Sequence, residues 1–408
     1  MTAKEIMKIF EDTAYVRMGG DTEELRSALY LQACCAKFGG EAQIEEFDVD
    51  MATIHEASLE VDGIAIPCKG YFNAGSGEVE APFYYLRNTD PYSLRQCKGK
   101  IVMIDGYLGY AIYSDIVENG AVGFITYDGN ANFVDRDIDQ RELRGYVAKG
   151  NKLLGVNINA KDAIEIVKKD AKNARIVLKQ DEYLGKSRNV VLDLPGEVDE
   201  YIALTAHYDS TSLSNGAYDN MSGSVGILGI AEYFAKNPHR YGLRVIWCGS
   251  EERGLLGSKA YCAAHEDELG KIVLNINLDM IGSIMGKFHA VCTSEEQLVG
   301  YISYFAAEQG FGIGVRQDIY SSDSSSFADK GVPAVSFARI APPNTATIHN
   351  SYDTDAVLSG EQMVKDIEFL IRFTDRMANA AICPVARVVP DNMKEKLDVY
   401  MTRKRAPK

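Results

Sequence analysis

The stretch Tyr201-Ile202-Ala203-Leu204-Thr205-Ala206-His207-Tyr208-Asp209 is an apolar run that ends in a histidine and an aspartate. An apolar run of this length, bounded by polar residues, is typical of a buried strand. From residue 189 onward, similar runs alternate with helical patterns, which predicts an α/β fold with a mostly parallel sheet. In such a sheet a ligand site lies beyond the carboxyl ends of the strands. We expect strands at 190–194, 201–206, 244–248, 272–278, 288–292 and 332–337, and helices at 222–234, 255–264, 295–309 and 361–377.

Acidic residues and a second histidine follow the same strand-end pattern. Asp219 lies between the strand that carries His207 and the next helix, Glu251-Glu252 follow the strand 244–248, and Asp279 follows the strand 272–278. His349 lies in a polar loop before the last long helix. We expect these side chains to meet at one edge of the sheet.

Such a cluster needs positive charge to persist. Two like charges about 4 Å apart repel by about 4 kcal/mol at an effective dielectric constant of ~20, and this edge collects four carboxylates. Two histidines and several carboxylates are a donor set that suits zinc, cobalt or manganese. His207 and Asp209 alternate along an extended chain and so face the same way, which would let Asp209 hold the far nitrogen of a metal-bound imidazole.

With these residues in place, the chain resembles the zinc-dependent peptidases of family M28. The resemblance covers residues 1–50 and about 188–384, and residues 52–186 resemble a protease-associated (PA) domain, an α/β module inserted in some members. Residues 385–408 are expected to form a C-terminal tail. The matching stretches are Ala203 to Ser210, Gly216 to Asn220, Glu251 to Ser258, Asn277 to Met280 and His349 to Thr354.

The resemblance implies a role for each matching residue. His207 and Asp279 would bind one zinc ion, Glu252 and His349 a second, and Asp219 would bridge the two, so the expected cofactor is two Zn²⁺ per chain, with Co²⁺ or Mn²⁺ as alternatives. Glu251 would act as general base and Asp209 would orient His207. The family often has a cis peptide bond after the bridging aspartate, which is Asp219-Asn220 here.

Some positions depart from the family pattern. Ile348 stands where some relatives have an oxyanion-stabilising tyrosine, so Tyr352 and Tyr218 become candidates for that role. Asp323 lies in a Ser-Asp-x-x-x-Phe loop that is near the substrate in the family. Arg339 could meet a substrate carboxylate or, equally well, form a surface salt bridge. The predicted substrate contacts are Asp323, Tyr352 and Arg339.

The amino-acid composition limits the kinds of partner that the chain is expected to bind. The 408 residues are 46% hydrophobic and 25% charged, with a net charge of −15, which argues against wrapping nucleic acid or an anionic membrane. The eight cysteines are scattered without CxxC pairs, and neither a signal peptide nor a membrane-spanning run is evident, so a cytoplasmic protein is expected. The expected partner is a peptide substrate, and a homo-oligomer stays open.

The expected function is a zinc exopeptidase, and an aminopeptidase before a carboxypeptidase or dipeptidase, because that is the commonest bacterial activity of the family. Peptidases of family M20 share the metal order, but their dimerisation domain has no room between Glu252 and His349. A single-zinc glutaminyl cyclase and a receptor-like scaffold that has lost its metals are further alternatives, although every ligand position is filled. The absence of a G-x-S-x-G motif argues against a serine hydrolase.

Overall fold

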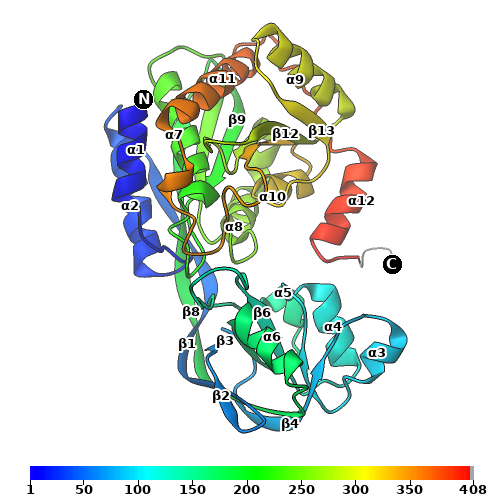
Figure 1. The fold of residues 1–408 in the computed structure, drawn as a ribbon. Coiled ribbons are helices and arrows are strands. Elements are labelled where there is room, and N and C mark those ends of the chain that lie inside the picture. Colours follow the sequence, from blue (N-terminus) through cyan, green and yellow to red (C-terminus); the bar gives the residue numbers. More distant parts are fainter. Residues whose placement is uncertain (405–408) are drawn as a thin grey trace. The chain divides into compact units, whose positions relative to one another are not determined.

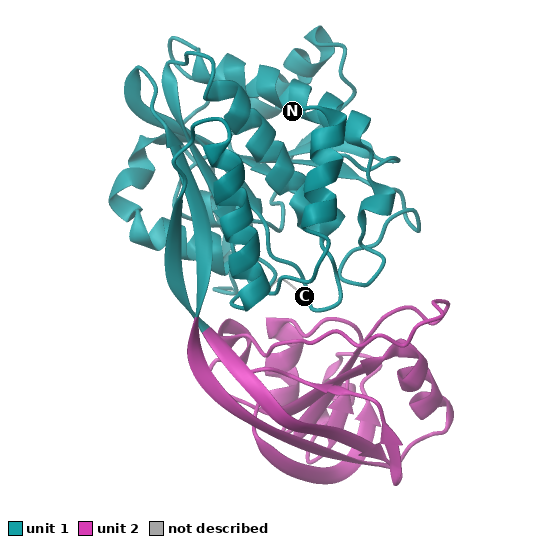
Figure 2. Cartoon of the chain, turned by 90° about the vertical axis from the view of Figure 1, so that its left-hand side faces the viewer, with its two compact units in different colours: residues 1–49, 186–406 teal, residues 50–185, 407–408 magenta. Residues whose placement is uncertain are grey.

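The computed structural model describes residues 1–404, and the chain divides into two compact units (Figures 1 and 2). Unit 1 combines residues 1–49 with the chain from residue 186 onward, and unit 2 comprises residues 50–185. The chain passes from one unit to the other within two long strands, β1 (Gln43–Val61) and β8 (Asn173–Leu194). The divisions at 49/50 and 185/186 fall within two residues of the expected ones, whereas unit 1 continues past the boundary expected at residue 384.

Unit 1 is built on a mixed sheet with the strand order β13-β12-β14-β11-β9-β10-β8. The four central strands β14, β11, β9 and β10 are parallel, whereas β12 runs antiparallel to β14 and β8 runs antiparallel to β10. The edge strand β13 is parallel to β12. The mostly parallel arrangement predicted from the sequence is therefore confirmed for the centre of the sheet. Besides β8, the strands of this sheet are β9 (Val198–His207), β10 (Tyr241–Cys248), β11 (Ile272–Leu278), β12 (Lys287–Thr293), β13 (Gly314–Gln317) and β14 (Ala334–Ile340).

Helices cover this sheet, and several begin at side-chain caps that the sequence supplies. Thr2 and Glu5 form a capping box at α1, Asp21 caps α2, and Ser359 caps α11. The helices of unit 1 are α1 (Ala3–Asp12), α2 (Thr22–Ala36), α7 (Ser222–Phe234), α8 (Leu256–Ala264), α9 (Glu296–Glu308), α10 (Ser324–Asp329), α11 (Gly360–Ala378) and α12 (Asp391–Tyr400).

Helix α7 is buried along almost its whole length, and glycines let it approach its neighbours closely. A Cβ on Gly223 would lie 2.2 Å from the carbonyl oxygen of Leu278 in β11, and one on Gly226 would lie 2.7 Å from the Leu278 side chain. Gly229 faces Ile367 of α11 instead. The start of α7, which follows the turn of Asp219, is thereby held against the end of β11, which is followed by Asp279.

Unit 2 is an α/β module with its own apolar core around Phe124, Ile125 and Val156. Its strands β4, β5, β6 and β7 are successive parallel neighbours, and β3 pairs antiparallel with β7. Its elements are β2 (Ile64–Ile66), β3 (Lys69–Gly70), β4 (Gly77–Tyr85), α3 (Pro91–Arg95), β5 (Ile101–Met103), α4 (Tyr110–Glu118), β6 (Gly123–Asp128), α5 (Gly145–Ala148), β7 (Leu154–Asn159) and α6 (Ala160–Lys168).

The expected C-terminal tail is wrong for residues 391–400, which form α12. Met393 and Leu397 are buried on one side of this helix and pack with Ala328 and Ala334 in unit 1. Their i, i+4 spacing places both on one helix face, and this was the available sequence signal. The last four residues of the expected tail lie outside the described residues.

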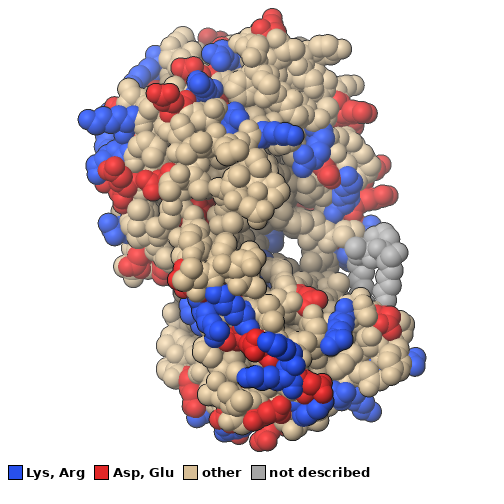
Figure 3. All heavy atoms as spheres, viewed as in Figure 1, with Lys and Arg blue, Asp and Glu red and all other residues tan. Residues whose placement is uncertain are grey.

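The surface shown in Figure 3 carries basic and acidic side chains side by side on each unit. Within residues 1–404, the longest and most apolar helices still fall short of what a membrane span requires.

Candidate metal centre

Three neighbouring strands deliver side chains to one edge of the unit 1 sheet. Strand β9 ends at His207, β10 leads through two residues into Glu251 and Glu252, and β11 is followed at once by Asp279. Strand β9 is paired in parallel with both β10 and β11, so the three carboxyl ends lie together. This is the strand-end cluster that the sequence predicts.

Asp219 reaches the cluster from the short helical turn Ala217–Met221 that precedes α7. The Asp219-Asn220 peptide bond is cis, as the resemblance implied. The Asn220 side chain fixes this turn, because its Nδ2 donates to the carbonyl of Leu278 (2.9 Å) and its Oδ1 accepts from the N–H groups of Gly223 (2.9 Å) and Met280 (3.0 Å). The turn is thus anchored on both sides of Asp279.

The ligand atoms form two groups that share Asp219. His207 Nε2 lies 3.1 Å from Asp219 Oδ1 and 3.8 Å from Asp279 Oδ1. His349 Nε2 lies 3.1 Å from Asp219 Oδ2 and 3.1 Å from Glu252 Oε2. Within each group, His207–Asp219–Asp279 and Asp219–Glu252–His349, one ligand atom per residue lies within 4.8 Å of the others.

Asp209 contacts three residues at this edge of the sheet, His207, Glu251 and Glu252. Its Oδ1 lies 3.5 Å from His207 Nδ1, on the side of the imidazole away from Asp219. The same carboxylate accepts hydrogen bonds from the backbone N–H groups of Glu251 (2.9 Å) and Glu252 (3.1 Å). One buried aspartate therefore orients the histidine and also fixes the turn that presents both glutamates.

The electrostatics of the cluster favour positive charge. Burial alone would lower the histidine pKa values, but the surrounding carboxylates raise the pKa of His349 to about 12 and that of His207 well above its usual range. Burial raises the pKa of Glu251 strongly and that of Asp279 to about 7. Burial also acts to raise the pKa of Asp219, but hydrogen bonds from His207 and His349 outweigh it and hold that pKa well below its usual range.

The donor atoms fit divalent metal ions. Asp279 Oδ1 is buried and has no hydrogen-bond partner among the described residues, which a metal ion would remedy. Imidazole nitrogens and carboxylate oxygens are the ligands that zinc takes in catalytic sites.

Three residues next to or within the centre have an unusual backbone conformation. Ser250, Met280 and His349 all have left-handed φ angles (54°, 66° and 59°), which non-glycine residues adopt mainly where the surrounding structure imposes them.

The family model for "Peptidase family M28" matches residues 189–372, a range that contains every residue of both ligand groups. Residues 189–372 belong to peptidase family M28.

Two curated proteins and one solved structure are similar to this chain. Aminopeptidase YwaD from Bacillus subtilis (strain 168) is 26% identical over 368 residues, which cover 83% of this chain and 75% of that protein. Leucine aminopeptidase 2 from Trichophyton rubrum is 40% identical over 97 residues, 23% of this chain and 20% of that protein. The solved structure of BSAP, a zinc aminopeptidase from Bacillus subtilis, shares the fold with a TM-score of 0.77 at 23% identity, covering 95% of this chain and 97% of that chain.

The structure shows the surroundings of two predicted substrate contacts, Arg339 and Asp323. The Arg339 guanidinium forms a bidentate ion pair with the buried Asp366 (2.6 and 2.8 Å), so it is committed to packing α11 against β14. Asp323 is completely buried, and this burial raises its pKa to about 6. The role of Asp323 as a substrate contact stays a prediction, because the likewise buried His207 and Asp279 belong to the metal centre.

The two tyrosine candidates differ. The Tyr218 hydroxyl donates to the carbonyl of Arg339 (2.6 Å) and accepts from the N–H of Ala341 (3.1 Å), so it is occupied by backbone groups rather than free to stabilise an oxyanion. Tyr352 is 42% exposed, and its role as a substrate contact stays a prediction.

Sequence reasoning missed Asp353, Arg17 and Glu24, all of which are buried beside the centre. Asp353 accepts hydrogen bonds from the N–H groups of Tyr218 (2.8 Å) and Asp219 (3.3 Å) and from the Ser214 hydroxyl. It therefore links the His349 loop to the turn of Asp219, and burial raises its pKa to about 7. Its place four residues after His349 was the available signal, whereas Arg17 and Glu24 carry none beyond the neighbouring Gly19-Gly20.

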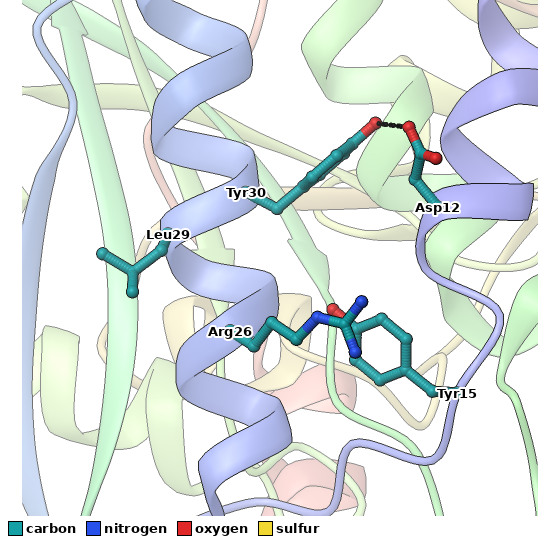
Figure 4. A pocket seen from close by; sticks show the side chains of 5 residues that line it. All are labelled: Asp12, Tyr15, Arg26, Leu29 and Tyr30. Carbon is teal, nitrogen blue, oxygen red and sulfur yellow. Dashed lines mark hydrogen bonds between the residues drawn. The ribbon is translucent and has the colours of Figure 1, made fainter.

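A hollow of about 430 Å³ lies elsewhere in unit 1, between α1 and α2 (Figure 4). Its charged side chains are paired within it, since Tyr30 donates to Asp12 (2.9 Å) and the Arg26 guanidinium lies 4.0 Å from the centre of the Tyr15 ring. Neither ligand group of the metal centre includes a residue of this hollow.

Proposed function

We propose that the chain is a zinc-dependent aminopeptidase with two metal ions in one centre. The observation that carries the proposal is the position of Asp219, whose two carboxylate oxygens each lie 3.1 Å from a different histidine. A single carboxylate shared by two three-residue groups would hold two metal ions close together, as in a two-metal hydrolase.

Each ion would have its own ligands besides the shared one. His207 and Asp279 would hold one ion, Glu252 and His349 the other, and Asp219 would bridge them. Zinc is the metal we propose, because the ligands are histidine nitrogens and carboxylate oxygens, and cobalt or manganese would suit the same donors. Ions held there would activate a water and polarise the peptide carbonyl.

The proton transfer belongs to Glu251. Its carboxylate lies at the centre, 4.0 Å from His207 Nε2, yet it is in neither ligand group. Because burial raises its pKa, Glu251 can hold a proton taken from the attacking water and pass it to the leaving amine. Asp209 keeps this carboxylate in place through the backbone N–H of Glu251.

The two complete ligand groups disfavour a single-zinc cyclase and a scaffold without metals. The same M28 fold also serves peptidases of other specificity, so the choice of aminopeptidase rests on the names of the relatives. For unit 2, we propose a PA-like module, on the basis of its parallel strands β4–β7 and its place as an insertion in the peptidase fold.

The specificity is tested with one peptide in three forms, free, C-amidated and N-acetylated, and with dipeptides. We expect the zinc-loaded chain to release the first residue of the free peptide and of its C-amidated form, but not of its N-acetylated form. Cleavage of the acetylated peptide but not the amidated one would replace aminopeptidase by carboxypeptidase. Cleavage of dipeptides alone would make the protein a dipeptidase, and a chain that binds two zinc ions but cleaves no peptide would be a scaffold.

A further inference from the structure

The segment from Arg17 to Glu24, which leads into α2, contacts both loops that carry the metal-centre carboxylates. Arg17 is fully buried. Its Nε donates to the carbonyl of Tyr208, and its two terminal nitrogens donate to the carbonyls of Asn215 and Gly216 (2.7 Å for Gly216). The guanidinium is thus hydrogen-bonded to both ends of the loop 208–216. This loop begins next to His207 and leads into the turn of Asp219.

The backbone of Arg17 holds the same loop. The Arg17 N–H donates to the Ser210 hydroxyl (3.1 Å), and the Ser210 N–H donates to the Arg17 carbonyl (3.1 Å). Gly216 is packed tightly between the turn of Asp219 and the Arg17 guanidinium. A Cβ on Gly216 would lie 2.7 Å from the Asp219 carbonyl oxygen and 2.9 Å from Arg17 Nη2. A shift of the guanidinium would therefore be transmitted to the backbone of Asp219.

The other end of the segment rests on the turn before Glu251. A Cβ on Gly19 would lie 2.7 Å from the Cα of Ser250, and the Gly19 carbonyl accepts a hydrogen bond from Arg253 (3.2 Å). The buried Glu24 accepts from the hydroxyls of Ser187 (2.5 Å) and Ser250 (3.5 Å). The segment accordingly connects the turn of Asp219 with the turn of Glu251 and Glu252.

The Arg17 guanidinium lies within hydrogen-bond distance of five carbonyls, because Nη1 also donates to Thr13 (3.3 Å) and Tyr15 (3.2 Å) besides Asn215 and so shares its two N–H groups among three acceptors. Only a guanidinium offers five N–H donors in a fixed plane, whereas lysine offers three on one rotating nitrogen. The carboxylates of Asp353, Asp209 and Asp219 lie near enough to interact with its charge. This chemistry is specific to arginine and goes beyond filling space.

We propose that Arg17 is a positioning residue of the metal centre: by fixing the loop 208–216 it places Asp219 between the two histidines and so sets the affinity of both metal sites. This inference rests on the proposed two-metal centre. Groups that orient metal ligands typically change metal affinity by about 10- to 100-fold when they are altered, and this is the effect expected of Arg17.

The test compares full-length Arg17→Lys with the wild-type chain and with Arg26→Lys. Arg26 is an exposed arginine of the nearby helix α2 whose guanidinium lies over Tyr15 (Figure 4), so it serves as the matched control. Zinc dissociation constants are measured by competition with a chelator, and the absorption spectrum of the Co²⁺-loaded chain reports ligand geometry. We expect Arg17→Lys to bind zinc about 10- to 100-fold more weakly with an altered cobalt spectrum, and Arg26→Lys to match the wild type.

A second variant covers the case in which Arg17→Lys does not fold. Ser210→Ala removes the hydroxyl that accepts from the backbone N–H of Arg17 and donates to the carbonyl of Thr211 (3.3 Å). It therefore loosens the same loop and should weaken zinc binding in the same direction by a smaller factor. Wild-type zinc affinity and cobalt spectrum in Arg17→Lys, or in Ser210→Ala if only that variant folds, would overturn the proposal, even if the melting temperature fell. A wild-type chain that binds two zinc ions but cleaves no peptide would contradict the proposed function and leave the role of Arg17 in metal binding intact.

Discussion

Glu251 and Glu252 are adjacent, but the structure gives them different surroundings. Only Glu252 is in a ligand group, with its Oε2 3.1 Å from His349 Nε2. The substitution Glu251→Gln should keep both metal ions and lower kcat by at least about 10³-fold, because proton transfer by a positioned side chain contributes about 10²–10⁴-fold. Steady-state kinetics with metal analysis of the same samples checks this.

The neighbouring variant Glu252→Gln is the control for that experiment. It should lose metal from the group with His349, which separates a ligand from a base. Near-wild-type turnover by Glu251→Gln would remove Glu251 from the proton transfer.

Glu24 predicts a pH dependence of stability. Burial raises its pKa to about 8 in the folded chain, whereas the ordinary glutamate pKa is 4.5. Between these pH values the folded chain binds more protons than the unfolded chain, so this group makes the free energy of unfolding fall as pH rises, by at most about 1.4 kcal/mol per pH unit. Glu24→Gln should reduce this fall in urea unfolding measured from pH 5 to 8.

The exposed neighbour Glu23 offers the matched control, because Glu23→Gln changes the same charge at the surface. It should leave the wild-type pH dependence in place. Equal slopes for Glu24→Gln and the wild type would show that Glu24 is already ionised in the folded chain.

At the scale of elements, α7 should tolerate no side chain where it meets β11. In Gly223→Ala the new Cβ would meet the Leu278 backbone carbonyl at 2.2 Å, so the helix or the strand must move. We expect a loss of about 1–3 kcal/mol in the free energy of unfolding, the usual cost of overpacking a core. Chemical denaturation measures this loss.

Gly300 in α9 provides the opposite case, because a Cβ there would have nothing within 4 Å. Gly300→Ala should be neutral or stabilise the chain by up to about 1 kcal/mol, as alanine favours helices. If Gly223→Ala were as stable as Gly300→Ala, the close packing of α7 on β11 would not hold.

The central strands and α7 could be predicted because their apolar periodicity continues over many residues. Helix α12 could not, since only Met393 and Leu397 mark its buried face. His207, Glu252 and Asp279 were predictable because each lies at or just beyond the end of a strand, whereas Asp219 and His349 lie in connecting segments. Arg17 could not be predicted, because it lies far away in sequence and contacts the loop 208–216 only in the folded chain. The ion pair of Arg339 could not be assigned to a partner from sequence, because Asp366 is on a later helix.

At the scale of the whole molecule, part of the acidity belongs to one site. Asp219, Glu251, Glu252 and Asp279 place four carboxyl groups at one edge of the sheet, and two divalent ions would bring the formal net charge from −15 to −11. The rest of the acidic surface shown in Figure 3 is interspersed with basic groups. Four of the negative charges are therefore concentrated at a site where metal ions would neutralise them.

The zinc content of the purified chain, dialysed against a slight excess of zinc and then freed of unbound metal, tests the central claim most directly. We predict two zinc ions per wild-type chain, and no more than one after His349→Ala, because that substitution removes a ligand from only one group. Peptide release from the free N-terminus should require both ions. One zinc ion or fewer in the wild-type chain would contradict a two-metal centre.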